Sequence, residues 1–124
     1  MTKPQIVRYG QPEGPGNKLS LPPERLVRND PERREWPHYD SSDGRASAGT
    51  WSGEEGAWRI AFPEGQYEYF HVLSGRGAIV DADGRRVEFG TGDAVVIPAG
   101  FHGVFEVAEK MVKHFFFYQQ NPAA

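Results

Sequence analysis

The sequence predicts a single all-β domain of the barrel or sandwich type. Short apolar or alternating runs recur at regular spacing after residue 46, turn signals separate them, and no long apolar stripe has the 3.6-residue period of a helix. The 15 glycines, 10 prolines and 13% aromatic residues also suit a turn-rich β protein. A chain of 124 residues matches one ordinary domain.

Residues 1–45 are expected to form an irregular N-terminal arm, and residues 46–124 the barrel. The arm is rich in proline, glycine and charge, which leaves few chances for regular periodicity. It also holds several large apolar residues, too many for a disordered tail, so we expect it to pack on the barrel or on a partner subunit. These residues are Leu21, Leu26, Val27, Trp36 and Tyr39.

Two local features of the barrel region give specific expectations. Asp83 and Gly84 are typical of a two-residue type I′ turn, which would pair Asp81 with Arg86 and Val80 with Val87 in a hairpin. The consecutive aromatic residues at 115–118 show no alternation, which predicts a last strand that is buried on both faces.

Composition excludes several classes of function. The formal net charge of −3 gives no electrostatic reason to expect a nucleic acid or an anionic membrane surface as partner. There is no cysteine, which excludes disulfides, thiolate metal sites and thiol catalysis. Neither a signal peptide nor a run of about 18 apolar residues is visible, so a cytoplasmic location is expected.

Two stretches have a regular spacing of glycine, proline and acidic residues. The first reads G-x5-F-x-E-x3-E-x6-G, and its residues are Gly56, Phe62, Glu64, Glu68 and Gly75. This spacing resembles the first motif of the cupins. Metal-binding cupins have two histidines at the positions of Phe62 and Glu64, and these bind the metal together with the glutamate that Glu68 matches. The second stretch, G-x5-P-x-G, comprises Gly92, Pro98 and Gly100, and Gly103 and Val107 follow where the family has a histidine and an asparagine.

Residues 46–118 resemble the small cupins once grouped as a domain of unknown function, which are related to ureidoglycine aminohydrolase and to ethanolamine-utilisation cupins. The resemblance implies a double-stranded β-helix, the jelly-roll barrel of the cupins, and a homodimer. A barrel of this kind encloses one pocket, and barrel mouths are common sites for small molecules.

Glu68 is the strongest candidate for a functional residue, because strand alternation places it with Phe70 and Val72 on one face of an apolar strand. A carboxylate in such a place needs a cation, hydrogen bonds or a proton. The structural alternative is an ion pair with a buried arginine such as Arg59. Both interpretations remain open at this point.

A catalytic role is also assigned to His102, which lies one residue before the family's histidine position. An offset of one residue turns a strand side chain to the opposite face. No cofactor is expected. A weaker alternative is a manganese or iron ion held by Glu64, Glu68 and His102, since carboxylate oxygens suit these metals better than zinc. Glu64 lies in a turn-like stretch, which favours a solvated carboxylate.

The first functional hypothesis is a cupin that binds a small polar or anionic metabolite in its barrel. Arg59 would recognise charge, Trp58, Phe70 and Phe105 would form the walls, and Glu68 would act as a polar or acid–base group in an isomerase or hydrolase. The alternative is a non-catalytic dimeric cupin that senses a ligand or serves as an accessory subunit. The replaced histidines favour this alternative.

Overall fold

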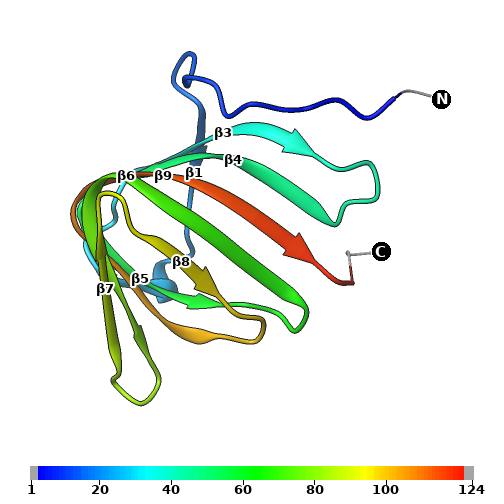
Figure 1. The fold of residues 1–124 in the computed structure, drawn as a ribbon. Helices are drawn as coiled ribbons and strands as arrows, with labels where there is room; N and C mark the ends of the chain where they lie inside the picture. The colour runs from blue at the N-terminus through cyan, green and yellow to red at the C-terminus, as the bar shows by residue number, and fades with distance from the viewer. Residues whose placement is uncertain (1–2, 122–124) are drawn as a thin grey trace.

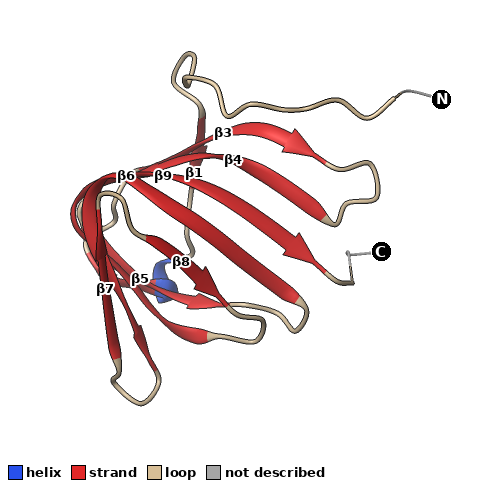
Figure 2. Ribbon diagram, in the orientation of Figure 1, coloured by secondary structure: helices blue, strands red, loops and turns tan. Residues whose placement is uncertain are grey.

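The computed structural model describes residues 3–121, which form a curled nine-stranded β-sheet (Figures 1 and 2). The all-β class expected from the sequence is confirmed. Within the described residues, the helical structure is a short 3-10 turn, η1 (Pro23–Arg25). The strands are β1 (Asn17–Leu19), β2 (Leu26–Arg28), β3 (Arg33–Asp40), β4 (Ala46–Gly53), β5 (Gly56–Ala61), β6 (Gln66–Asp81), β7 (Arg86–Gly90), β8 (Ala94–Ile97) and β9 (His102–Gln119).

The two long strands β6 and β9 organise the sheet. They pair with each other in antiparallel fashion, and β9 also pairs with β4 and β5, while β6 pairs with β7 and β8. One path across the sheet therefore runs β1-β3-β4-β9-β5-β2. Figure 1 shows β3, β4, β9, β6 and β8 side by side as one layer, which curls round into β5 and β7.

The curl depends on glycines in the middle of β6. The register with β9 shifts between Val72 and Gly77, and Gly75 has a φ of 86°, a conformation that favours glycine. A Cβ atom at Gly75 would also collide with the carbonyl oxygen of Lys110 on β9. These shifts bend the strand pair, so that both halves of β6 contribute to one interior.

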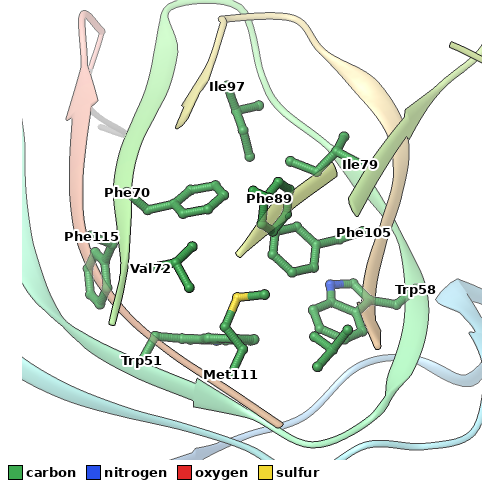
Figure 3. Close-up of a cluster of buried hydrophobic side chains, with 11 residues drawn as sticks. Trp51, Trp58, Phe70, Val72, Ile79, Phe89, Ile97, Phe105, Met111 and Phe115 are labelled. Carbon is green, nitrogen blue, oxygen red and sulfur yellow. The ribbon is translucent and has the colours of Figure 1, made fainter. Parts of the chain in front are cut away.

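The interior is filled by aromatic and aliphatic side chains that alternate along the strands (Figure 3). Phe70, Val72, Val107 and Met111 are fully or almost fully shielded from solvent. The remaining members of the core are Trp51, Trp58, Ile79, Phe89, Ile97, Phe105 and Phe115.

The hairpin between β6 and β7 has a different register from the predicted one. Ile79 pairs with Val87 and Val80 with Arg86, one position away from the expected pairs. Of the two turn residues, Gly84 has a positive φ, and Asp81 forms the closing backbone hydrogen bond with Arg85. The loop thus holds three residues, the arrangement of a type I turn followed by a glycine bulge. The prediction of a two-residue type I′ turn was therefore wrong.

The expectation that residues 115–118 are buried on both faces was also wrong. Phe115 is buried, whereas Phe116 and Tyr118 are about two fifths exposed. The strand alternates as an ordinary one-sided strand does, because no second sheet lies on the outer face of β9 within residues 3–121, where the N-terminal segment places Tyr9 against His114.

The N-terminal region is irregular over residues 3–16 but more regular further on. Residues 33–40 form β3, which pairs with β4 over most of its length. The 3-10 turn η1 lies beside β5, where Arg59 donates a hydrogen bond to the carbonyl oxygen of Glu24. The inner face of β3 brings Arg33 and Glu35 to the pocket described next.

Candidate functional site

The concave side of the curled sheet contains a pocket of about 440 Å³. Its volume lies within the range of about 300–1,000 Å³ that is usual for small-molecule sites. Polar and apolar surface line it in about equal measure, and the apolar part includes Trp51, Trp58, Phe62, Phe105 and Phe115. The polar side chains that reach the pocket are Arg25, Arg33, Glu35, Gln66, Glu68 and Lys113.

Glu68 and Lys113 form a buried ion pair in the wall of this pocket. Lys113 Nζ donates a hydrogen bond to Glu68 Oε2 at 2.8 Å, and each residue is only 5% exposed. Glu68 comes from β6 and Lys113 from β9, two strands that pair directly. Because each charge neutralises the other, the barrel interior tolerates both.

The ammonium group of Lys113 is also surrounded by aromatic rings. It lies 4.2 Å from the ring centre of Phe70, 4.8 Å from that of Trp51 and 5.0 Å from that of Phe105. Cation–π contacts of this kind contribute about 2 kcal/mol or more when they are shielded from water. The rings thus hold the lysine in place and orient its ammonium group towards Glu68.

Arg33 supplies a second buried cation. Its guanidinium lies 5.3 Å from the ring centre of Trp58 and donates hydrogen bonds to the carbonyl oxygens of Pro31 and Leu19. Burial lowers the pKa of Arg33, but an arginine remains charged in proteins. The pocket therefore carries a fixed positive charge on the β3 side.

Arg25 and Glu35 complete the polar lining. Arg25, at the end of η1, is held by two hydrogen bonds to the carbonyl oxygen of Arg59. Burial raises the pKa of the Glu35 carboxyl, and the negative charge of Asp40 raises it further. Because Lys113 is paired with Glu68, the other charged side chains of the lining are two arginines and one carboxyl whose charge is disfavoured, so the pocket suits an anion.

Three of the residues expected at the site line this pocket together: Glu68, Trp58 and Phe105. Phe70 packs behind them in the core, against Phe89 and Phe105, and is completely shielded from solvent. It supports the wall without reaching the pocket surface.

The structure places Arg59 outside the pocket. It follows Trp58 on β5, so alternation turns its side chain to the outer surface, where it is exposed. The structural alternative for Glu68, an ion pair with an arginine such as Arg59, does not form with Arg59, and Glu68 pairs with Lys113 instead. Arg59 still acts near the site indirectly, because it holds η1 and its carbonyl oxygen anchors Arg25.

The structure does not bring Glu64, Glu68 and His102 together. His102 opens β9 on the face opposite to Phe105 and is exposed, and Glu64 is exposed in the turn between β5 and β6. Residues 3–121 contain no group of three His, Cys, Asp or Glu side chains placed to hold a metal ion.

These residues do not fit the divalent metal that the cupin resemblance implies. The first histidine position holds Phe62, an apolar wall residue, and the glutamate that would bind the metal is engaged by Lys113. A lysine ammonium beside Glu68 repels a cation and already supplies the counter-charge that the carboxylate needs.

Sequence analysis missed Lys113, Arg33 and Glu35. Lys113 was hidden in a strand interpreted as buried on both faces, although Met111, Lys113, Phe115 and Phe117 share one face by simple alternation. A lysine on an otherwise apolar face was the signal in the sequence that could have identified Lys113 as a site residue. Arg33 and Glu35 lie in a segment expected to be irregular, where no face was assigned.

The fold and the placement of the pocket define a cupin-type β-barrel. A family model described as EutQ-like cupin domain matches residues 40–115. The chain belongs to this family of EutQ-like cupins, as its motif spacing indicated.

Solved structures support the same fold. The EutQ protein of Clostridium difficile is 20% identical with a TM-score of 0.62, and the match covers 73% of this chain and 69% of that one. A putative ethanolamine utilization protein Q from Salmonella typhimurium is 14% identical with a TM-score of 0.62, covering 90% of this chain and all of the other.

A third similar structure is a protein of unknown function from Pseudomonas syringae. It is 17% identical with a TM-score of 0.71, and the match covers 91% of this chain but 44% of the Pseudomonas chain. No curated protein sequence matches this chain. Within residues 3–121, no helix has the length and apolar character needed to cross a membrane.

Proposed function

We propose that this chain is a cupin that binds a small carboxylate-bearing metabolite in its pocket without a metal, with Glu68 as the polar or acid–base group. The observation that carries the proposal is the Glu68–Lys113 pair, which lines the pocket instead of being sealed in the core. A pair that served packing alone would be replaceable by apolar residues at little cost, and often with a gain in stability.

Recognition of the ligand's negative charge falls to Arg33 and Arg25. Arg33 is held by Trp58 and by two carbonyl oxygens, so its guanidinium is oriented before a ligand arrives. A preorganised arginine recognises a carboxylate through paired hydrogen bonds. The aromatic walls, with Trp58 and Phe105 as members, would enclose the rest of the molecule.

The chemistry open to Glu68 is proton transfer. Lys113 donates a hydrogen bond that holds the carboxylate at the pocket wall, within reach of a proton on a bound molecule. Such a pair suits removal of a proton from a bound substrate, as in an isomerase, or activation of water, as in a hydrolase. Neither reaction requires a metal in this arrangement.

A second candidate function is a non-catalytic cupin that senses a ligand or serves as an accessory subunit. The replacement of the family's histidines by Phe62 and Glu64 favours it. In that case the pocket binds the same class of anion, and Glu68 with Lys113 only fixes the ligand's orientation.

The test is a thermal-shift screen of the purified protein against small carboxylates and their neutral amides. We expect stabilisation by a subset of the carboxylates and not by the matching amides. Arg33→Gln should remove or strongly reduce that stabilisation, while Arg59→Gln, the same change at an exposed position, should preserve it. Equal responses of both variants, or no carboxylate that binds, would refute the proposal.

A turnover assay distinguishes an enzyme from a non-catalytic cupin. Each stabilising carboxylate is incubated with the protein and followed by NMR for proton exchange or hydrolysis. Conversion that is lost in Glu68→Gln supports an enzyme. Binding without any conversion supports the sensing or accessory function.

A further inference from the structure

Within residues 3–121, two carboxyl groups line the pocket, and one of them lacks a counter-charge. Glu68 on β6 accepts a hydrogen bond from Lys113, which compensates its negative charge. Glu35 on β3 forms no ion pair with a lysine, arginine or histidine of the described chain, and no side chain donates a hydrogen bond to it. The proposed function uses Glu68 and leaves Glu35 without a role.

The sheet directs the side chain of Glu35 into the pocket. Glu35 pairs with Trp51 of β4, and Trp51 lines the pocket. Residues directly opposite each other on paired strands share a face, and so do residues two positions apart on one strand, such as Glu35 and Arg33. Glu35 is partly buried there, so its carboxyl is available to a bound molecule.

The two arginines of the pocket are engaged by other partners. Arg33 lies over the ring of Trp58 and donates hydrogen bonds to two backbone carbonyl oxygens. Arg25 donates two hydrogen bonds to the carbonyl oxygen of Arg59. Both guanidinium groups keep their positive charge without an ion pair to Glu35. A ligand carboxylate attracted by these cations would therefore approach an unpaired carboxyl.

The immediate surroundings of Glu35 favour its neutral form. The two residues paired with it across the sheet, Asn17 of β1 and Trp51 of β4, are uncharged. Burial raises the pKa of the Glu35 carboxyl, and the negative charge of Asp40 on the same strand raises it further. A carboxyl that must share its pocket with a second anion has one more reason to hold a proton, since two negative charges at close range repel each other.

We infer that Glu35 binds the ligand as a neutral carboxyl, which donates a hydrogen bond to the bound carboxylate, so that a proton is taken up together with the ligand. The inference rests on the proposed function and adds a specificity-determining residue to it. An ionised Glu35 would repel a carboxylate held by Arg33, whereas a protonated Glu35 offers an O–H donor. A hydrogen bond from a neutral acid to a carboxylate is charge-assisted, and such bonds are short and strong.

This coupling predicts that carboxylates bind more weakly as the pH rises. Below the pKa of Glu35 in the free protein, the carboxyl is already protonated and its titration does not affect affinity. Above that pKa, each ligand must bind together with a proton, so the affinity should fall by up to about tenfold for each pH unit.

The experiment is calorimetric titration of the full chain with malonate, succinate and benzoate between pH 5 and pH 8. Two cationic buffers of different ionisation enthalpy are used, because they do not compete for an anion site. Wild type should take up a proton with each probe that binds, which makes the measured heat depend on the buffer. Binding without proton uptake at any pH in this range would overturn the inference and leave the proposed function intact.

Glu35→Gln retains a hydrogen-bond donor and cannot ionise. It should bind the same probes without proton uptake, with an affinity that does not depend on pH, and should bind them more tightly than wild type at the upper end of the range. Glu64→Gln, the same change at an exposed position outside the pocket, should keep the wild-type pH dependence. Equal pH profiles of Glu35→Gln and wild type would overturn the inference, because another group would then take up the proton.

A second measurement requires neither a ligand nor a variant. Carbon-13 NMR of the assigned glutamate carboxyl groups follows the titration of Glu35 in the free wild-type protein. Glu35 should titrate above the ordinary value of a glutamate, and the addition of a probe that binds should raise its pKa further. Titration at or below the ordinary value would overturn the inference even if carboxylates bind. Failure of every probe to bind at pH 5, where Glu35 is most readily protonated, would overturn both the inference and the proposed function.

Discussion

Lys113 Nζ lies 2.8 Å from Glu68 Oε2, and the two residues are 45 positions apart in the sequence. This pair replaces the metal-binding pattern of the cupin motif with an ammonium group and a carboxylate. Both charges are almost completely buried and three aromatic rings surround the lysine. The pair therefore has consequences for stability that can be measured separately from ligand binding.

Lys113→Met should destabilise the fold by about 3–5 kcal/mol, because it leaves the Glu68 carboxylate buried without a counter-charge. The double variant with Glu68→Gln should recover most of that loss. Lys110→Met removes a lysine whose ion pair with Glu54 is exposed, so a change below about 1 kcal/mol is expected. Denaturant unfolding measures all three. A Lys113→Met protein as stable as Lys110→Met would contradict the buried pair.

Arg33 and Arg59 should differ sharply in their effect on carboxylate binding. Arg33 faces the pocket, whereas Arg59 points outward. Arg33→Met should weaken binding about tenfold or more, in line with the loss of a charged hydrogen bond worth about 1.5–3 kcal/mol. Arg59→Met should change affinity by no more than about threefold. Calorimetric titration with a stabilising carboxylate measures both, and the reverse order would show that recognition lies elsewhere.

Gly75→Ala should destabilise the barrel by at least about 2 kcal/mol, since a side chain disfavours the φ of 86° and its Cβ would strike the Lys110 carbonyl oxygen. Gly10→Ala is the control, because no atom lies within 4 Å of the added Cβ and its φ is not in the left-handed region. Thermal unfolding measures the stability of both variants. If both variants melt at the same temperature, the close approach of β6 to β9 at Gly75 is not needed for folding.

Acid should weaken the packing of the N-terminal segment around His114. Burial lowers the pKa of His114, and the imidazoles of His38 and His71 lower it further. The groups that face it are Tyr9 from the segment, His38 from β3 and His71 from β6.

Because the folded state holds the His114 proton less tightly than the unfolded state does, stability falls as pH drops through 6.5 and the loss is complete below the lowered value. His114→Asn should flatten this part of the profile of unfolding free energy against pH. His102→Asn, at an exposed position, should leave it unchanged. A wild-type profile that is flat between pH 7 and 5 would exclude this role for His114.

Much of the fold was predictable from local patterns. The spacing of short runs and turn signals identified the all-β class, and alternation in β6 correctly grouped Glu68, Phe70 and Val72 on the buried face. The glycine and proline positions of the cupin motifs identified the family. These features depend on residues near one another in the sequence, so a single sequence reveals them.

The candidate site was only partly predictable. Glu68, Trp58 and Phe105 follow from motif position and alternation, and they do line one pocket. Arg59 and His102 do not line the pocket. Arg59 follows the inward-facing Trp58 by one position and therefore points outward, and His102 is exposed, on the face that its one-residue offset from the family's histidine position indicated.

The sequence by itself determined the fold class, the family and the position of one buried carboxylate. Only the tertiary structure decided what that carboxylate contacts. Lys113 reaches Glu68 because β6 and β9 pair, and Arg33 enters the pocket because β3 pairs with β4. Such contacts form only when strands that are distant in the chain pair with each other. That pairing depends on hydrogen bonding across the sheet and on burial of its inner face, which are properties of the whole barrel.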